Sequence, residues 1–491
     1  MIKVLTPELT AGALDCRGAR AGASVVPDND ESRTMTLETR VIPRRAVVSW
    51  IVYDLANVIF TMGVNSLYFP LFVRAAVGSE RADSLVGRIS AVSMGIMFCL
   101  SPLLGAMTDR ARKRMPFLAW ATVLCCAAVA IIGRGPFALS ALFWVIANAG
   151  YQAGVQFYDS LLPEVTTEAN RGRINGIAIG LGYIGSYIAV GTGLLMTSES
   201  HGFPFTTYFP FVGLAFFILA LPCFLFVRER GNDNPRPTFT YGAVAESLRQ
   251  TIHTLKSGHQ YPGLLRFLVG RAFYTDAINT VIVFMSLYTV NVSIATGLTK
   301  ESGEQKAQLV LMSAITAAII GGVTWGFVVD KLGPKRTLDI VLGGWMATFV
   351  MAAAIGFLHL PIAWLFVVAC VAGICLGGTW ASDRPLMLRL TPPGRVGEFY
   401  GLYGMVGRFS AVTGPLIWGA TTWIVVEKSG LPVLTGEAFA ILSLLAMVIV
   451  SFAILRGVTD TPRNWESLAS PIAASEATLQ PAGSTSGALL E

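Results

Sequence analysis

Two short stretches of the chain each place an aspartate and an asparagine three residues apart inside apolar sequence. Asp54 and Asn57 lie in an apolar run over residues 47–73, and Asp276 and Asn279 repeat the spacing half a chain later. An ionisable group inside a bilayer costs at least ~2.5–3.5 kcal/mol, so it normally faces a cavity or a partner. Residues three apart share a helix face. These four side chains are therefore candidates for binding a small solute or a proton in a cavity wall.

A fixed ion pair or hydrogen bond is the alternative role for the two aspartates. Arg271 and Arg408 also lie in apolar sequence and need counter-charges, so either could pair with Asp54 or Asp276. Arg408 lies deep in its apolar run and joins the candidates for the binding site.

A continuous polar stripe is expected on a helix over residues 136–161. Its members are spaced 4, 4 and 3 apart, and lipid cannot satisfy them, so they must face protein or water. The stripe consists of Asn148, Gln152, Gln156 and Asp159. We expect the first three in the binding site.

The composition indicates a membrane protein. Of 491 residues, 53% are hydrophobic and 13% charged, and the mean hydropathy is +0.60, whereas soluble domains are about a quarter charged. No basic stripe suggests nucleic-acid binding. The seven cysteines show no metal-ligand spacing, and neither a metal nor a cofactor is implied.

Twelve membrane-spanning helices are predicted, because ~20 apolar residues cross ~30 Å of hydrocarbon as a helix. Lys and Arg gather in alternate connections, which places these connections and both chain ends in the cytoplasm. The predicted spans are residues 47–73, 86–107, 116–133, 136–161, 173–197, 205–227, 264–291, 307–329, 337–357, 362–383, 397–425 and 434–456.

The longest connection divides the chain into two halves. Tyr241, Val244, Leu248, Ile252 and Leu255 recur at helical spacing within it, which predicts an amphipathic helix on the inner membrane surface. The predicted organisation is a disordered cytoplasmic tail (1–46), a six-helix bundle (47–227), the linker (228–263), a second six-helix bundle (264–456) and a second tail (457–491).

The two halves are related by an internal duplication. Gly-x-x-x-Asp-[Arg/Lys] occurs in residues 105–110 and again in 326–331, at an offset of 221. The Asp-x-x-Asn pairs repeat at an offset of 222, and Asp159 and Asp383 at 224. Transporter folds are often built from such repeats.

These residues resemble the major facilitator superfamily, whose loop after the second helix reads Gly-x-x-x-Asp-[Arg/Lys]-x-Gly-x-[Arg/Lys]-[Arg/Lys]. The second copy, which includes Gly333, Lys335 and Arg336, fits throughout. The first copy has Arg112 where the pattern has its second glycine, so its turn is expected to differ.

Within the superfamily, several stretches resemble the vacuolar amino-acid effluxer-like (autophagy-related) family. They are SWIVYDLANVIF, FYDSLLPEVTTEANRGRINGIAIGLGYIGS, LVGRAFYTDAINTVIVFMSLYT and PPGRVGEFYGLYGMVGRFSAVTGP. The resemblance implies a transporter of a small polar solute, with amino acids first. It also implies that the first, fourth, seventh and tenth helices line a central cavity.

A cytoplasmic gate is expected where the motif loops meet the ends of these helices. Asp159 and Asp383 lie near such ends, and Glu164 could form ion pairs that break on opening, although incidental loop charges are the alternative. The candidate gate residues are Gly105, Asp109, Arg110, Arg114, Asp159, Glu164, Arg171, Arg173, Gly326, Asp330, Lys331, Gly333, Arg336 and Asp383.

We therefore expect an all-α membrane protein of twelve transmembrane helices in two pseudo-symmetric six-helix bundles. It would be a multi-pass monomer of a bacterial-type inner membrane, with a small-molecule substrate and lipid as partners and no nucleic acid. It would work by alternating access, with Asp54 and Asp276 as candidate proton sites.

Three alternatives stay open from the sequence. They are a cation-coupled sugar symporter, a multidrug exporter and a non-transporting receptor. An enzyme is disfavoured, because the sequence contains no nucleotide-binding loop and the polar stripes contain no nucleophile–base pair.

Overall fold

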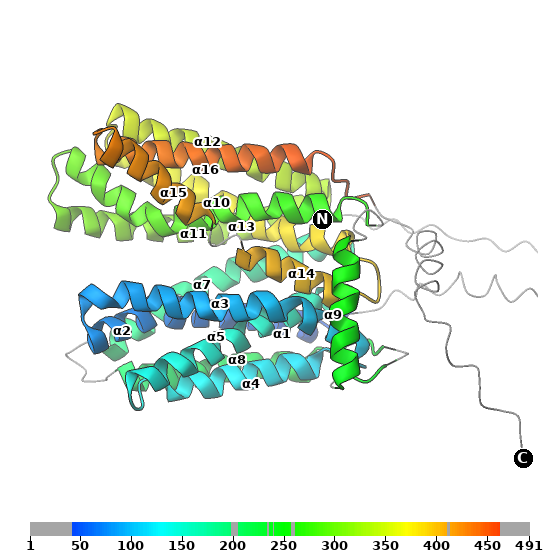
Figure 1. The fold of residues 1–491 in the computed structure, drawn as a ribbon. Helices are drawn as coiled ribbons and strands as arrows, with labels where there is room; N and C mark the ends of the chain where they lie inside the picture. Colours follow the sequence, from blue (N-terminus) through cyan, green and yellow to red (C-terminus); the bar gives the residue numbers. More distant parts are fainter. Residues whose placement is uncertain are drawn as a thin grey trace, which may run out of the picture. The chain divides into compact units, whose positions relative to one another are not determined.

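A computed structural model describes residues 42–197, 205–232, 235–238, 240–256, 261–409 and 413–461. These residues belong to one compact unit, and within them the regular structure is helical throughout (Figure 1). Most of the two predicted tails, residues 1–41 and 462–491, lies outside the described residues.

The helices fall into an N-half (residues 42–232) and a C-half (residues 261–461), joined through α9 (Tyr241–Lys256). The N-half contains α1 (Arg44–Phe60), the π-helical η1 (Thr61–Tyr68), α2 (Phe69–Val77), α3 (Ser79–Arg110), α4 (Met115–Ile131), α5 (Phe137–Ser160), α6 (Leu162–Val165), α7 (Arg171–Thr197) and α8 (Phe205–Phe226). The C-half contains α10 (Leu264–Ala295), α11 (Lys300–Leu332), α12 (Pro334–Leu358), α13 (Ala363–Arg389), α14 (Val396–Phe409), α15 (Thr413–Thr422), the π-helical η3 (Trp423–Lys428) and α16 (Val433–Leu455).

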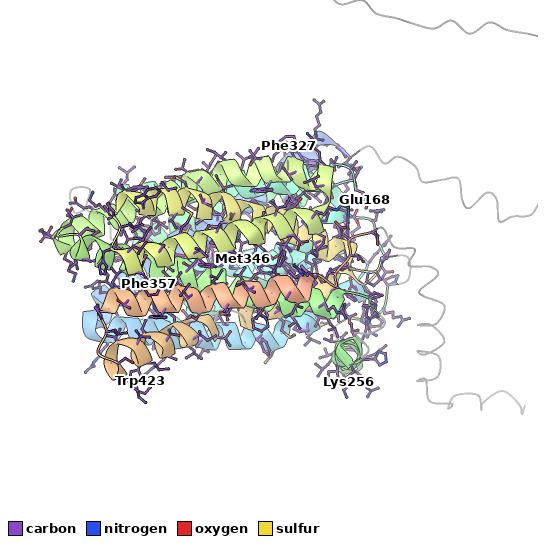
Figure 2. The ribbon with its side chains drawn as sticks, turned by 90° about the horizontal axis from the view of Figure 1, so that it is seen from above. Glu168, Lys256, Phe327, Met346, Phe357 and Trp423 are labelled. Carbon is purple, nitrogen blue, oxygen red and sulfur yellow. The ribbon has the colours of Figure 1, made fainter. Side chains whose placement is uncertain are left out.

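Ten helical segments among the described residues are long and apolar enough to cross a membrane. The expected number of twelve would also require α4, which is apolar but only 17 residues long, and α5, which carries the polar stripe. Twelve therefore stays a prediction. Apolar side chains such as Phe327 and Trp423, which are 43% and 46% exposed, lie on the outside of the helices where lipid would cover them (Figure 2).

Several helices are longer than the predicted spans. The first span runs from Arg44 to Val77 and α11 from Lys300 to Leu332, whereas we predicted residues 47–73 and 307–329. Hydropathy marks only the part that matches the hydrocarbon, but a helix continues into the polar interface while its own hydrogen bonds can form.

The two motif loops turn differently, as their sequences predict. Gly333 joins α11 directly to α12 with φ +86°, a left-handed conformation that glycine adopts without a steric penalty. In the first copy, Ala111–Arg114 separate α3 from α4, and Ala111 is extended (φ −73°, ψ 156°). The residue change at Arg112 therefore accompanies a longer connection.

Helix α9 occupies the segment where the amphipathic helix is predicted, and it crosses one end of the other helices (Figure 1). We call this end the α9 end. Glu246 of α9 accepts a 2.6 Å hydrogen bond from Arg110 of α3, and Leu248 and Ile252 stay exposed. Contact of this exposed face with a membrane surface stays a prediction.

Two crossings between the halves are lined by glycine. In the α7–α11 crossing, a Cβ on Gly176 would collide with the backbone of Gly322 and Gly326. In the α3–α14 crossing, a Cβ on Gly105 would collide with the carbonyl of Gly397. Small residues four apart let helix backbones approach closely, so these positions set the contact between the halves.

The α7–α11 crossing gives a direct stability test. Gly176→Val overpacks it, so we expect a loss of about 1–3 kcal/mol in unfolding free energy and a lower Tm in detergent. Gly191→Val is the matched control, because Gly191 lies on the same helix with nothing within 4 Å of an added Cβ. Equal melting temperatures for the two variants would contradict the packing described here.

Candidate functional site

A cavity of about 490 Å³, lined by apolar surface together with several charged and polar side chains, lies between the N-half and the C-half. Side chains from α1, α5 and α7 face side chains from α10, α13 and α14 across it. Its lining includes Asp54, Asn57, Gln152, Gln156, Asp159, Asn279 and Arg408 of the predicted site and gate residues, together with Tyr151, Tyr183, Arg271, Trp380, Arg384, Tyr400 and Tyr403.

The strongest charge contact across the cavity joins two N-half carboxylates to one C-half guanidinium. Arg384 Nε lies 3.0 Å from Asp159 Oδ1 on α5, and Arg384 Nη2 lies 3.6 Å from Asp54 Oδ1 on α1. All three side chains are nearly buried. Buried ions need compensation inside the protein, and here two negative charges share one positive charge.

A second arginine, Arg271 of α10, is fully paired within the C-half. Its Nε lies 3.0 Å from Asp383 Oδ2, and its guanidinium carbon lies 3.5 Å from the centroid of the Tyr403 ring. Tyr274 and Tyr403 donate hydroxyl hydrogen bonds of 2.6 and 2.8 Å to the Asp383 carboxylate. Asp383 is therefore tied inside one half.

Arg408 of α14 bridges the halves without a carboxylate. Its Nη1 donates to Ser101 Oγ of α3 at 2.8 Å, and its Nη2 donates to the backbone carbonyl of Gln152 at 3.1 Å. The side chain is 7% exposed.

The α5 stripe divides between packing and cavity. Asn148 does not line the cavity: it donates to Ser93 and accepts from Asn65, each at 2.9 Å. Gln156 and Ser101 form a short hydrogen bond at the cavity edge. Gln152 lines the cavity beside Arg408.

Asp276 lies apart from Asp54. Its carboxylate accepts hydrogen bonds from the Thr413 hydroxyl and from the Gly414 N–H at 2.8 Å, where α15 begins. It is not among the residues that line the cavity, whereas Asn279 is. These contacts favour the hydrogen-bonding role that the sequence left open, and a proton-binding role for Asp276 stays a prediction.

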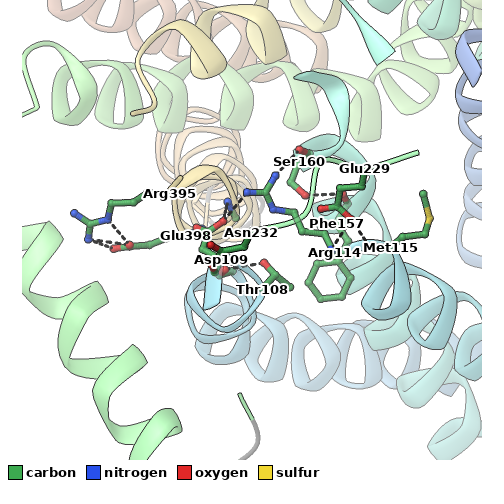
Figure 3. A network of polar contacts seen from close by, with 12 residues as sticks. Thr108, Asp109, Arg114, Met115, Phe157, Ser160, Glu229, Asn232, Arg395 and Glu398 are labelled. Atoms are coloured by element: carbon green, nitrogen blue, oxygen red, sulfur yellow. Dashed lines mark hydrogen bonds and ion pairs between the residues drawn. The ribbon is translucent and has the colours of Figure 1, made fainter. Parts of the chain in front are cut away.

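The two motif aspartates each hold the first turn of a helix from the opposite half. Asp109 accepts from the N–H groups of Gly397 and Glu398 of α14, both at 2.7 Å, and pairs with Arg114 at 2.8 Å (Figure 3). Asp330 accepts from Gly172 and Arg173 of α7 in the same way, at 2.7 and 3.1 Å.

These contacts are favourable for two reasons. The first N–H groups of a helix have no partner within the helix, and a carboxylate there also meets the positive end of the helix dipole. The two interactions join the halves at the α9 end.

The other predicted gate residues take varied places. Glu164 pairs with Arg230 at 3.4 Å, and Arg110 with Glu246 at 2.6 Å. Lys331 and Arg336 are exposed, Arg171 is half-buried, and Arg173 lies over the Phe327 ring at 5.9 Å. Gly105 and Gly326 allow close backbone contact at the α3–α14 and α7–α11 crossings, and Gly333 forms the turn between α11 and α12.

Three charged residues were not expected from the sequence: Arg384, which lines the cavity, and Glu229 and Glu398, which lie at the α9 end. Arg384 follows Asp383 directly, but the predicted span ended at 383 and so assigned it to a loop. Glu229 accepts N–H bonds from Arg114 and Met115 at 2.6 and 3.0 Å; burial raises the pKa of its carboxyl, and these bonds oppose the shift. Glu398 is buried against Arg395, Gln250 and Thr254.

No group of three or more potential metal-ligating His, Cys, Asp or Glu side chains occurs within the described ranges.

Comparisons with known proteins agree with the resemblance expected from the sequence. A family model described as vacuole effluxer Atg22 like matches residues 72–463. The uncharacterized MFS-type transporter YxiO of Bacillus subtilis is 25% identical over 429 residues, which cover 84% of this chain and 94% of that protein. Autophagy-related protein 22-1 of Neosartorya fischeri is 26% identical over 337 residues, 63% of this chain and 51% of the fungal protein.

Solved structures share the fold. The human organic anion transporter MFSD10 (TETRAN) aligns with a TM-score of 0.63 at 15% identity, over 84% of this chain and 99% of that one. A bacterial homologue of the iron transporter ferroportin in its outward-facing state aligns with a TM-score of 0.61 at 16% identity, over 84% and 98%. The fold is therefore that of the major facilitator superfamily.

The closure of the α9 end can be tested through Asp109. Asp109→Asn removes charge-assisted hydrogen bonds and one ion pair. Hydrogen bonds to charged groups contribute about 1.5–3 kcal/mol, so we expect the cavity to open toward the α9 end about tenfold more often. The readout is the labelling rate of a single cysteine at the cavity position Val155, by a polar thiol reagent supplied from that side.

Asp339→Asn is the matched control for this test. Asp339 pairs with Lys335 four residues away on the same helix, so this substitution leaves the contacts between the halves intact. Labelling that is equally fast in the wild type and in Asp109→Asn would show that the Asp109 contacts do not hold the end closed.

Proposed function

We propose, because the chain belongs to the Atg22-like vacuole effluxer family, that it is a secondary transporter that moves a small polar solute, with amino acids as the first candidates. The observation that carries the proposal is the cavity between two halves whose contacts at the α9 end are reciprocal and breakable. A site enclosed between two such halves suits alternating access, in which one half rocks against the other.

The ion pairs of Arg384 supply a way to link cargo to this movement. Asp54 and Asp159 share one guanidinium, so a proton or a cargo ammonium that neutralises either carboxylate weakens a contact between the halves. A ligand shifts a conformational equilibrium by its differential affinity for the two states. We propose that binding at Asp54 promotes opening at the α9 end, with a proton as the coupling ion.

We also propose the orientation and location. The α9 end carries the motif loops, where Lys and Arg are concentrated, so it would face the cytoplasm. The protein would then be a multi-pass monomer of a bacterial-type inner membrane, with both chain ends in the cytoplasm.

A counterflow assay tests the proposal. Purified protein in liposomes is preloaded with one solute at a time from a panel of amino acids and sugars, and uptake of the labelled solute is followed. Counterflow needs no driving ion, so it separates cargo from coupling. Exchange of an amino acid supports the proposal, exchange of sugars only favours the cation-coupled sugar symporter, and no exchange with any solute contradicts the proposal.

Coupling is tested by substituting the two aspartates. We expect Asp54→Asn to abolish accumulation driven by a pH gradient and to retain counterflow, because asparagine carries no titrating proton. Asp276→Asn separates the two roles left open for Asp276. Loss of coupling would show a proton site, whereas retained coupling with a loss of about 1.5–3 kcal/mol of stability would show that the carboxylate only holds the start of α15. Undiminished pH-driven accumulation in Asp54→Asn would contradict the role of Asp54.

A further inference from the structure

Arg408 differs from the two other arginines that line the cavity. Arg271 lies 3.0 Å from Asp383, and Arg384 lies 3.0 Å from Asp159. Among the described residues, no carboxylate lies within ion-pair distance of Arg408. The next four residues of the chain, 409–412, are Phe, Ser, Ala and Val, so the sequence that follows offers none either. An unpaired cation in a buried position is costly.

The guanidinium also keeps an unused donor. Its two Nη atoms donate to Ser101 and Gln152, but the buried Nε has no hydrogen-bond acceptor. Guanidinium presents its N–H groups as a planar fork that matches a carboxylate. Arg408 lines the cavity, and a guanidinium there with no counter-charge and one unsatisfied N–H is suited to a ligand's anionic group.

At the other end of the cavity, which we call the opposite pole, the buried charges are unbalanced in the opposite sense. Asp54 and Asp159 share the single charge of Arg384, which leaves one negative charge in excess. Nearby on α1, both the oxygen and the nitrogen of the Asn57 amide are buried without a hydrogen-bond partner, so the preference at this end comes from the two carboxylates. This pole favours a cation or a donor, and the Arg408 pole favours an anion.

The two poles lie at different depths along the helices. Arg408 contacts Gln152, and Asp159 follows seven residues later on the same helix, which is a rise of about 10 Å. A ligand at Arg408 therefore has its anionic group some two helical turns from the Asp159 carboxylate. The unpaired charge of Arg408 is thus separate from the Arg384 ion pairs.

We propose that Arg408 is the specificity-determining residue for a carboxylate on the cargo. The carboxylate would accept from the guanidinium, and it would supply the counter-charge that the protein itself lacks. The proposal rests on the proposed function, because it treats the cavity as the cargo site. It goes further by requiring that the cargo be an anion or a zwitterion at this end.

Acids and their amides provide the test. Alanine, leucine and lysine, their carboxamides, and lactate are each titrated against the purified protein, and binding is followed as an upward shift in Tm. In the wild type we expect acids to bind about tenfold or more tightly than the matching amides, as for other hydrogen bonds to charged groups. Arg408→Gln should abolish this preference, and Arg408→Lys should keep part of it.

Arg266→Gln is the matched control, because Arg266 is exposed on α10 and does not line the cavity; it should keep the wild-type preference. The Tm of each variant without ligand shows whether the protein remains folded. Binding of lactate would support the carboxylate subsite and show that the ammonium group is dispensable.

Two results would overturn the assignment. One is an equal preference for acid over amide in the wild type and in Arg408→Gln, which would mean that Arg408 only links α14 to the N-half by hydrogen bonds. The other is a wild type that no acid of the panel stabilises. Failure of counterflow while acid binding stays intact would instead contradict the proposed transport and leave the subsite standing.

Discussion

A charge buried among membrane helices must be compensated within the protein, because lipid offers no hydrogen bonds. In this chain part of the compensation is made between the halves. Arg384 of the C-half lies between Asp54 and Asp159 of the N-half, and Asp109 and Asp330 accept from helix N-termini across the same divide. The contacts that compensate these buried charges thus also join the halves.

The duplication explains why two equivalent aspartate contacts join the halves at the α9 end. Asp109 and Asp330 occupy the same place in the repeated motif, and each holds the first turn of a helix in the other half. Beside each aspartate, a glycine-lined crossing brings the backbones into direct contact. In the proposed opening of the α9 end, both carboxylates would have to leave their helices.

Much of the fold follows from the sequence alone. The apolar runs, the repeated motif and the Asp-x-x-Asn pairs indicate the major facilitator fold. Asp54, Asn57 and Gln152, which the sequence places in the binding site, line the cavity. Side-chain partners were less predictable. Asp54 and Asp276 have identical spacing to their asparagines, but only Asp54 meets a guanidinium, whereas Thr413 and Gly414 of α15 donate to Asp276. Arg384 was missed because the predicted span 362–383 stops one residue before it, whereas α13 continues to Arg389.

The central claim is that the halves rock about the cavity, and distances between spin labels across both ends test it most directly. One pair, at Lys113 and Pro393, spans the α9 end, and the other, at Arg74 and Lys300, spans the opposite end (Figure 1). With a solute that the protein exchanges, we expect a longer distance to appear at the α9 end and a shorter one at the opposite end. Unchanged distances, or widening at both ends together, would contradict alternating access.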